Sequence, residues 1–187
     1  MSRRADPELE DRILQAARKL WKKGGEKGLS MRKVAREART TTPTVYSRFR
    51  TKQEILSALL RRIQQDWAVV IESCTNPEEA GQRCLDFALS HPHEYELLYA
   101  DWFGRATPAS ESRANVELMK SKLAQWLGGQ PADYNRLVLA EWALLHGAVM
   151  LIITKSVKAE VAAQLRDAFH EVMLALVRSA NVVSMKR

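Results

Sequence analysis

The sequence feature that most constrains this chain is residues 41–49, Thr-Thr-Pro-Thr-Val-Tyr-Ser-Arg-Phe. Wound as an α-helix at about 100° per residue, the segment places Val45 and Phe49 on one side, where both can enter a core. Three small, uncharged side chains face the opposite side: Pro43, Thr44 and Ser47. Because short hydroxyl side chains let a helix approach base edges closely, this face predicts contact with a DNA groove.

The neighbours of this segment predict a helix-turn-helix. Tyr46 and Arg48 flank its polar face and can reach phosphates on either side. Ser30 is a good N-cap for a helix over residues 31–38, whose apolar side chains share one face. Residues 39–41 then separate two short helices, which is the spacing of a helix-turn-helix. An ordinary short surface helix remains the simpler alternative.

A capping box follows, and with it a family resemblance. Thr51 and Glu54 form a T-x-x-E capping box for the next helix. Residues 35–56 resemble the signature of TetR-type transcriptional repressors, with an alanine-rich second helix, a turn, and T-V-Y-S-R-F-x-T-K-x-E-I-L. Five residues match it position by position: Thr44, Tyr46, Phe49, Lys52 and Leu56.

The turn departs from the family pattern. The family usually has glycine where this chain has Arg39, and an aliphatic residue where it has Thr40. A non-glycine residue in a left-handed turn costs about 1 kcal/mol. Arg39 is therefore either an additional DNA contact or the mark of a different turn, and the sequence leaves both open.

From this segment and the resemblance we expect a set of DNA contacts. Thr44 and Ser47 should lie against the major groove, and Tyr46 and Lys52 should contact phosphates. The basic arm of residues 2–4 is either a minor-groove or phosphate contact or a solvated tail. The expected DNA-binding residues are Ser30, Arg39, Thr41, Thr42, Pro43, Thr44, Tyr46, Ser47, Arg48 and Lys52.

The charge distribution also indicates a nucleic-acid module. Residues 1–56 hold 15 Lys and Arg against 7 Asp and Glu, a net of +8, whereas residues 57–187 hold 14 against 15, a net of −1. The two sum to the net +7 of the 187 residues. A general basic bias would not stop at one segment, so we interpret the first third as the part that binds DNA.

Cysteine content and hydropathy indicate a cytoplasmic protein. Cys74 and Cys84 are too few for a disulfide framework or a zinc site, and we expect both reduced and packed. We expect no signal segment, because the chain begins with a basic and then an acidic run. The longest apolar stretch, residues 142–153, is interrupted by His146 and is too short to span a membrane.

Helical periodicity runs through the whole chain and predicts an all-α fold of about nine helices. Residues 1–50 should form a three-helix helix-turn-helix domain and residues 51–187 a helical ligand-binding and dimerisation domain. Asp6 should cap the first helix and Gly24-Gly25 should end it. Further helices are expected over residues 52–73, 77–90, 92–103, 111–127, 132–154 and 158–183.

The carboxy-terminal half shows a looser resemblance to a subset of the same family. Residues 87–95 and 141–147 resemble its F-A-x-x-H-P and W-x-x-x-H-G elements, which implies a ligand-binding and dimerisation domain. His146 is either a hydrogen-bonded core histidine or a pocket residue. The aromatic side chains, if not simply core, fit a cavity between helices. The expected ligand-binding residues are Trp67, Phe87, Tyr99, Trp102, Phe103, Trp126, Trp142 and His146.

The last two helices are more apolar than one monomer's core needs, which predicts a homodimer. Two helices from each chain would form a four-helix bundle about a two-fold axis, so the operator should be palindromic. The alternative is that both helices only complete a monomer core. The expected interface residues are Leu144, Gly147, Ala148, Leu151, Leu165, Phe169, Val172 and Leu176.

Catalytic and metal sites have little support. His91, His93, Glu94 and Glu96 alternate at a helix start without converging, so a helix cap and surface charge explain them better than a metal. No catalytic or phosphate-binding motif occurs, and we expect no enzyme activity and no cofactor. The sequence predicts a ligand-relieved repressor that binds a palindromic double-stranded DNA operator as a homodimer. A sequence-tolerant architectural DNA-binding protein without a ligand is the rival, and an enzyme the more distant one.

Overall fold

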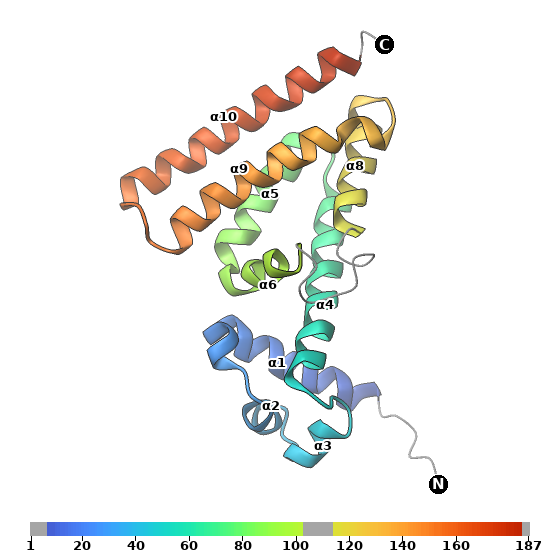
Figure 1. Cartoon of the computed structure of the whole chain (residues 1–187), viewed down its shortest axis with the longest axis vertical. Coiled ribbons are helices and arrows are strands. Elements are labelled where there is room, and N and C mark those ends of the chain that lie inside the picture. The colour runs from blue at the N-terminus through green and yellow to red at the C-terminus, as the bar shows by residue number, and fades with distance from the viewer. Residues whose placement is uncertain (1–6, 103–113, 185–187) are drawn as a thin grey trace. The chain divides into compact units, whose positions relative to one another are not determined.

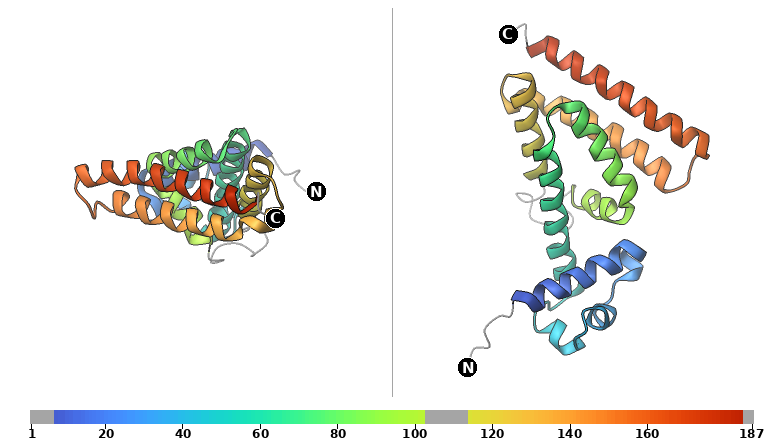
Figure 2. Two further views of the ribbon diagram at one scale, coloured as in Figure 1. Left: turned by 90° about the horizontal axis from the view of Figure 1, so that it is seen from above. Right: turned by 180° about the vertical axis from the view of Figure 1, so that it is seen from behind.

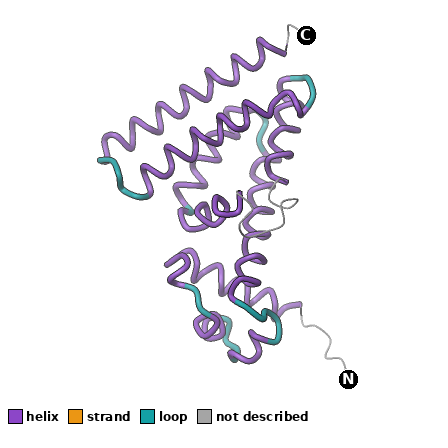
Figure 3. Tube along the Cα trace, in the orientation of Figure 1, coloured by secondary structure: helices purple, strands orange, loops and turns teal. Residues whose placement is uncertain are grey.

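The computed structural model describes residues 7–102 and 114–184. These residues form nine α-helices and one 3-10 helix, with no strand among them (Figures 1 and 3). The predicted all-α fold is therefore confirmed. Asp6, the basic arm of residues 2–4 and the expected helix start at residues 111–113 lie outside the described residues. The elements are α1 Pro7–Gly28, α2 Met31–Glu37, α3 Thr42–Tyr46, α4 Lys52–Ser73, α5 Pro77–Ser90, α6 Pro92–Trp102, α8 Ala114–Leu127, η1 Pro131–Tyr134, α9 Asn135–Ile153 and α10 Ala159–Ser184.

The chain divides into two compact units. One comprises Met1–Gln65 with His93–Ala109, and the other comprises Asp66–Pro92 with Ser110–Arg187. Helix α4 therefore begins in the first unit and ends in the second, and α6 belongs almost wholly to the first. Besides residues 1–50, the first unit holds most of α6 and more than half of α4.

The core of the first unit forms around α1. Its apolar stripe buries Ile13, Ala17 and Trp21, as the helical spacing predicted. Val45 and Phe49 are buried as well, which confirms the side of the 41–49 segment that was expected to face inward. Further buried side chains come from α2 and α4: Val34, Ala35, Ile55, Leu59, Leu60 and Ile63.

Helix α1 loses its regular geometry at the glycine pair that was predicted to end it. Gly24 (φ −152°, ψ 16°) and Gly25 (φ 52°, ψ −141°) are non-helical, and one further turn extends to Gly28. Gly25 has a left-handed φ, and a Cβ there would lie 3.0 Å from Nδ1 of His93 on α6. Glycine is thus required at this position for both its backbone conformation and the close approach of α6.

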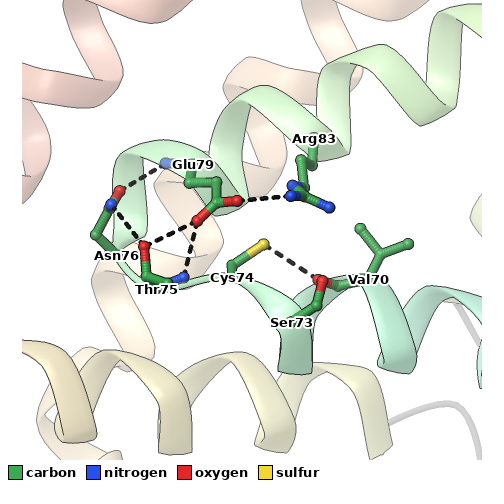
Figure 4. A network of polar contacts seen from close by, with 7 residues as sticks. All are labelled: Val70, Ser73, Cys74, Thr75, Asn76, Glu79 and Arg83. Carbon is green, nitrogen blue, oxygen red and sulfur yellow. Dashed lines mark hydrogen bonds and ion pairs between the residues drawn. The ribbon is translucent and has the colours of Figure 1, made fainter.

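A polar network fixes the turn between α4 and α5 (Figure 4). Oδ1 of Asn76 accepts from the Glu79 backbone N–H (2.8 Å), so Asn76 is the N-cap of the helix expected from residue 77. Oε2 of Glu79 accepts from both N–H and Oγ1 of Thr75 (2.9 and 3.0 Å), and Arg83 pairs with its other oxygen (2.7 Å). Cys74 lies in the same turn, and its Sγ donates to the Val70 carbonyl (3.1 Å).

In the second unit α5, α9 and α10 pack on one another, and α8 and η1 pack against α9 (Figures 1 and 2). Helix α10 packs closely on α5 at Gly81, where a Cβ would lie 3.0 Å from Cε of Met173. A separate core cluster of α8, η1 and α9 is built from Leu123, Tyr134, Leu137 and Val138. Cys74 and Cys84 are free and buried, as predicted.

Helix α9 is the most apolar element. By length and composition alone, Pro131–Ile153 is long enough to cross a membrane, which the twelve-residue stretch in the sequence did not suggest. Core helices of soluble proteins meet the same criterion. Only 22% of its most apolar window is buried within the chain, so α9 presents apolar side chains outward as well as inward.

Candidate nucleic-acid interface and ligand region

The two helices of the predicted helix-turn-helix begin at hydroxyl N-caps. Oγ of Ser30 accepts from the Lys33 N–H at the start of α2, and Oγ1 of Thr41 accepts from the Thr44 N–H at the start of α3 (both 3.3 Å). The Thr40 N–H donates to the Ala35 carbonyl (2.9 Å) and closes the turn between them. Helix α2 ends at Glu37 and α3 begins at Thr42, so two short helices are joined by a short turn. This confirms the helix-turn-helix that the sequence predicted.

The turn itself keeps the left-handed conformation. Arg39 has φ 53° and is exposed. Arg39 therefore adopts the left-handed conformation that glycine adopts without strain, at a cost of about 1 kcal/mol. Its contact with DNA stays a prediction.

Helix α3 is shorter than the nine-residue helix expected. It ends at Tyr46, with Ser47 as its C-cap, and a turn continues to Phe49, whose N–H donates to the Val45 carbonyl (2.9 Å). Oγ of Ser47 donates to the Thr44 carbonyl (2.8 Å), and such side-chain bonds compete with the regular helical pattern. Val45 and Phe49 still lie on the same inward side, because the hydrogen bond from the Phe49 N–H to the Val45 carbonyl continues the helical turn.

The outward side of α3 is a ridge of three hydroxyls, from Thr41, Thr44 and Ser47. Oγ1 of Thr41 and Oγ1 of Thr44 are 2.8 Å apart and share a hydrogen bond, whereas the Ser47 hydroxyl is held by the Thr44 backbone carbonyl. Pro43 and Ser47 are exposed, and Tyr46 is 50% exposed. Oriented hydroxyl oxygens on a narrow, uncharged ridge are suited to accept from or donate to base edges.

Lys52 is partly engaged within the first unit. Its Nζ donates to the Glu26 carbonyl (3.0 Å) and lies 3.4 Å from Oε1 of Glu26. Because an ammonium has three donors, one N–H stays available for the phosphate contact that was predicted. The first half of the capping box predicted before α4 is formed, because Oγ1 of Thr51 accepts from the Glu54 N–H (3.1 Å). The Glu54 carboxylate accepts from the N–H of Arg50 (2.7 Å), one residue before the N-cap.

The acidic residue Glu94 on α6 is buried, and its interpretation as surface charge was wrong. Its side chain is 0% exposed, Oε1 accepts from Nε of Arg18 (2.6 Å), and Nζ of Lys22 lies 3.6 Å from Oε2. Nε1 of Trp21 donates to the His93 carbonyl next to it (2.6 Å). The local sequence around Glu94 does not predict this, because the cations lie on α1. Among the described residues no three His, Cys, Asp or Glu side chains gather into a possible metal site.

The expected ligand-binding residues fall into separate groups. In the second unit Phe87 lies 4.9 Å from Trp67, edge to face at 70°, and 4.9 Å from the His91 ring, stacked at 24°. Trp142 and His146 on α9 stack at 5.6 Å and 6°. Burial lowers the pKa of His146.

The remaining expected ligand residues lie elsewhere. Trp126 packs against the cluster around Tyr134, with Nζ of Lys122 5.0 Å from its ring. Tyr99 is half-buried on α6 in the first unit. Trp102 ends α6, but its side chain is not among those described, and Phe103 lies outside the described residues.

One acidic residue near the aromatic side chains was missed. Glu141 on α9 is only partly exposed, and burial raises its pKa to about 7. Its charge in turn contributes to the raised pKa of the Cys84 thiol on α5, after the larger effect of burial. The signal was present in the sequence, because Glu141 falls three residues after Val138 and four before Leu145, which are both buried.

The expected interface residues divide by exposure. Ala148 and Phe169 are buried within the single chain, and a Cβ on Gly81 would lie 4.0 Å from the Phe169 ring. Gly147, Leu151 and Val172 are exposed, whereas three others are half-buried: Leu144, Leu165 and Leu176. Leu139 and Val161 on the same two helices are exposed apolar side chains as well.

Both parts of the chain match known protein families. Residues 13–59 match the family described as bacterial regulatory proteins, tetR family, and residues 78–177 match the tetracyclin repressor-like C-terminal domain. None of the curated proteins compared with the chain matches it.

Several solved structures have the same fold. The multidrug binding protein EbrR complexed with imidazole is 23% identical, with a TM-score of 0.66 over 91% of this chain and 96% of EbrR. The regulator SCO7222 from Streptomyces coelicolor is 18% identical, with a TM-score of 0.69 over 93% and 98%. A TetR variant from Acinetobacter baumannii AYE in complex with minocycline is 17% identical, with a TM-score of 0.66 over 92% and 96%.

Proposed function

The chain belongs to the tetR family of bacterial regulatory proteins, and from this premise we infer that it is a ligand-relieved repressor acting as a homodimer on a palindromic operator. It is a DNA-binding transcriptional regulator of a non-enzymatic family. The observation that carries the proposal is the ridge of three hydrogen-bonded hydroxyls on α3, presented from a net-positive first third of the chain. As a member of a soluble regulator family, it acts in the cytoplasm.

The hydroxyl ridge of α3 contacts the DNA bases, and the residues around it fix the position of the protein on the duplex. Thr44 and Ser47 contact base edges in the major groove, where short side chains allow close approach. Tyr46 and Arg48 beside the ridge, Arg39 in the turn and the remaining donor of Lys52 contact phosphates. Ser30 and Thr41 hold the two helix starts whose backbone N–H groups face the DNA backbone.

Dimerisation uses the outward face of α9 and α10. The two helices pack on each other, and apolar side chains on both remain exposed in the single chain: Leu139, Leu151, Val161 and Val172. A Cβ on Gly147 would meet nothing within 4 Å, so a helix of a second chain can approach there. Two such pairs form a four-helix bundle, which buries this surface.

The effector acts through the second unit. EbrR has been crystallised with imidazole, ethidium and proflavin, and the Acinetobacter regulator with minocycline. By analogy, a small molecule binds the aromatic residues of α4, α5 and α9 in this chain. An effector shifts the equilibrium toward a dimer that no longer fits its operator, and the coupling expected is about 1–3 kcal/mol.

A competition binding experiment tests this function. A palindromic duplex selected from random DNA is bound by the full chain while unrelated duplex competes. Sequence-specific repression requires a preference of at least about a thousandfold for the selected site. A preference below about tenfold would instead favour the architectural DNA-binding alternative.

A further inference from the structure

Glu141 lies on the inward side of α9. Val138, Leu145 and Val149 are buried at positions −3, +4 and +8 from it, so the carboxylate lies on the stripe that packs toward α5. On α5 the buried thiol of Cys84 is close enough for the Glu141 charge to contribute to its raised pKa, after the larger effect of burial. A carboxylate on such a stripe is costly unless a cation or donor satisfies it.

No described residue supplies that partner. Within residues 7–102 and 114–184, no ion pair or hydrogen bond to the Glu141 carboxylate is formed, whereas Glu94, the most buried acid, has two cations beside it. Cys84 has no positive charge to offer, and burial disfavours the charged form of His146. The described residues therefore leave the Glu141 carboxylate without a countercharge, which a bound cation would supply.

Aromatic rings lie on both helices that flank this carboxylate. Phe87 follows Cys84 by three residues on α5, and its ring contacts Trp67 and His91. Trp142 follows Glu141 directly, and its ring stacks on His146. Ring faces attract a cation and stack on planar ligands, and an apolar surround strengthens the attraction of a single carboxylate for a positive charge.

We propose that the α5–α9 interface of the second unit binds a planar aromatic cation, with Glu141 as its countercharge and the rings of Phe87 and Trp142 against its faces. The inference rests on the proposed effector function and specifies the chemical class of the effector. A cation satisfies the carboxylate that residues 7–102 and 114–184 leave without a partner, which a neutral aromatic molecule of the same shape does not do.

Direct binding without DNA tests the inference. The full chain is titrated with N-methylacridinium, a permanent cation, and with neutral acridine at mildly alkaline pH, with probe fluorescence as the readout. We expect the wild type to bind the cation at least about tenfold more tightly than the neutral probe. Glu141→Gln should lose that preference while its affinity for acridine stays the same. The exposed carboxylate of Glu160 gives the matched control, and Glu160→Gln should keep the preference.

Three results would overturn the proposal: equal affinity for the two probes, a Glu141→Gln variant that keeps the cation preference, or a wild type that binds neither probe. Circular dichroism of each variant shows that it is folded. Operator binding is measured separately without probe. If the operator is bound but the cation is not, this inference fails and the proposed DNA-binding function stands; if the cation is bound but no operator is, the proposed function fails.

Discussion

Arg18 on α1 and Glu94 on α6 form an ion pair across 76 residues of sequence, with Nε of Arg18 2.6 Å from Oε1 of a carboxylate that is completely buried. Lys22 gives the same carboxylate a second, longer contact of 3.6 Å. Because the pair joins a helix of the DNA-binding motif to a helix from the other half of the sequence, it makes α6 a part of the first unit.

Arg18→Met should lower the free energy of unfolding by about 2 kcal/mol or more, because it leaves a buried carboxylate with only the more distant Lys22. Urea unfolding followed by circular dichroism measures the change. Lys19→Met is the matched control, since it breaks the exposed pair with Glu37 (2.5 Å) and should have a much smaller effect. Equal losses in both variants would contradict the role of the Glu94 pair.

Arg39→Gly should separate the strain of the turn from DNA binding. Glycine removes the strain of about 1 kcal/mol that arginine has at a positive φ, but it also raises the conformational entropy of the unfolded chain. The free energy of unfolding should therefore be unchanged or slightly higher. Affinity for all duplexes should fall, and the slope of log K against log salt should decrease by about one.

Lys155 offers the control, because it also has a positive φ (54°) and lies in the second unit. Lys155→Gly should change stability in a similar way without any effect on DNA affinity. An Arg39→Gly variant with unaltered salt dependence would show that Arg39 contacts no phosphate.

Substitutions on α3 should separate base reading from phosphate contact. Ser47→Leu puts bulk on the hydroxyl ridge and should change the sequence recovered by selection from random DNA. Tyr46→Phe removes only a hydroxyl from the rim, so it should weaken binding to all sequences by about 1 kcal/mol and leave the selected sequence unchanged. If Ser47→Leu selects the wild-type sequence, the ridge does not read bases.

Glu141 should make stability depend on pH. Its pKa rises from 4.5 to about 7 through burial, so between these values the folded chain binds more protons than the unfolded chain. The stabilisation is complete below about pH 4.5 and is lost as pH rises through 7, with an amplitude of up to about 3 kcal/mol. The free energy of unfolding of Glu141→Gln minus that of the wild type should therefore increase from pH 5 to pH 8, as urea unfolding at each pH would show; a constant difference would contradict the shift.

Charge on the outward face of α10 should break the dimer. Val172 is 43% exposed in the single chain, and Val172→Glu should give a folded monomer in sedimentation velocity at micromolar concentration, because a carboxylate would be buried in the bundle. Val69→Glu is the control on α4, where the wild-type side chain is 64% exposed. A Val172→Glu variant that sediments like the Val69→Glu variant would place the interface elsewhere.

Local signals in the sequence predicted most of the fold. The bounds of α4, the N-cap Asn76 and the break at Gly24-Gly25 follow from caps and glycine conformations that act within a few residues. The helix-turn-helix was predicted for the same reason. Helix α3 is shorter than predicted, and the Ser47 hydroxyl at its end donates to the Thr44 backbone carbonyl.

The features that the sequence did not reveal depend on distant partners. Glu94 has the local pattern of a surface residue, and only the packing of α6 on α1 brings Arg18 to it. In the sequence, Phe169 could belong to an apolar face of α10 that packs in the core or to one that packs against a second chain. The packing of α10 on α5 places it beside Gly81 in the core. Periodicity gives the side of a helix that is apolar, but not the element that covers it.

The most direct test of the account is selection of DNA from a random library by the full chain, followed by the mass of the complex with the selected duplex. We predict an inverted repeat with half-sites about one helical turn or somewhat more apart, roughly 34–36 Å, bound by an even number of chains. A single unrepeated site bound by one chain, or no enrichment over random duplex, would contradict it.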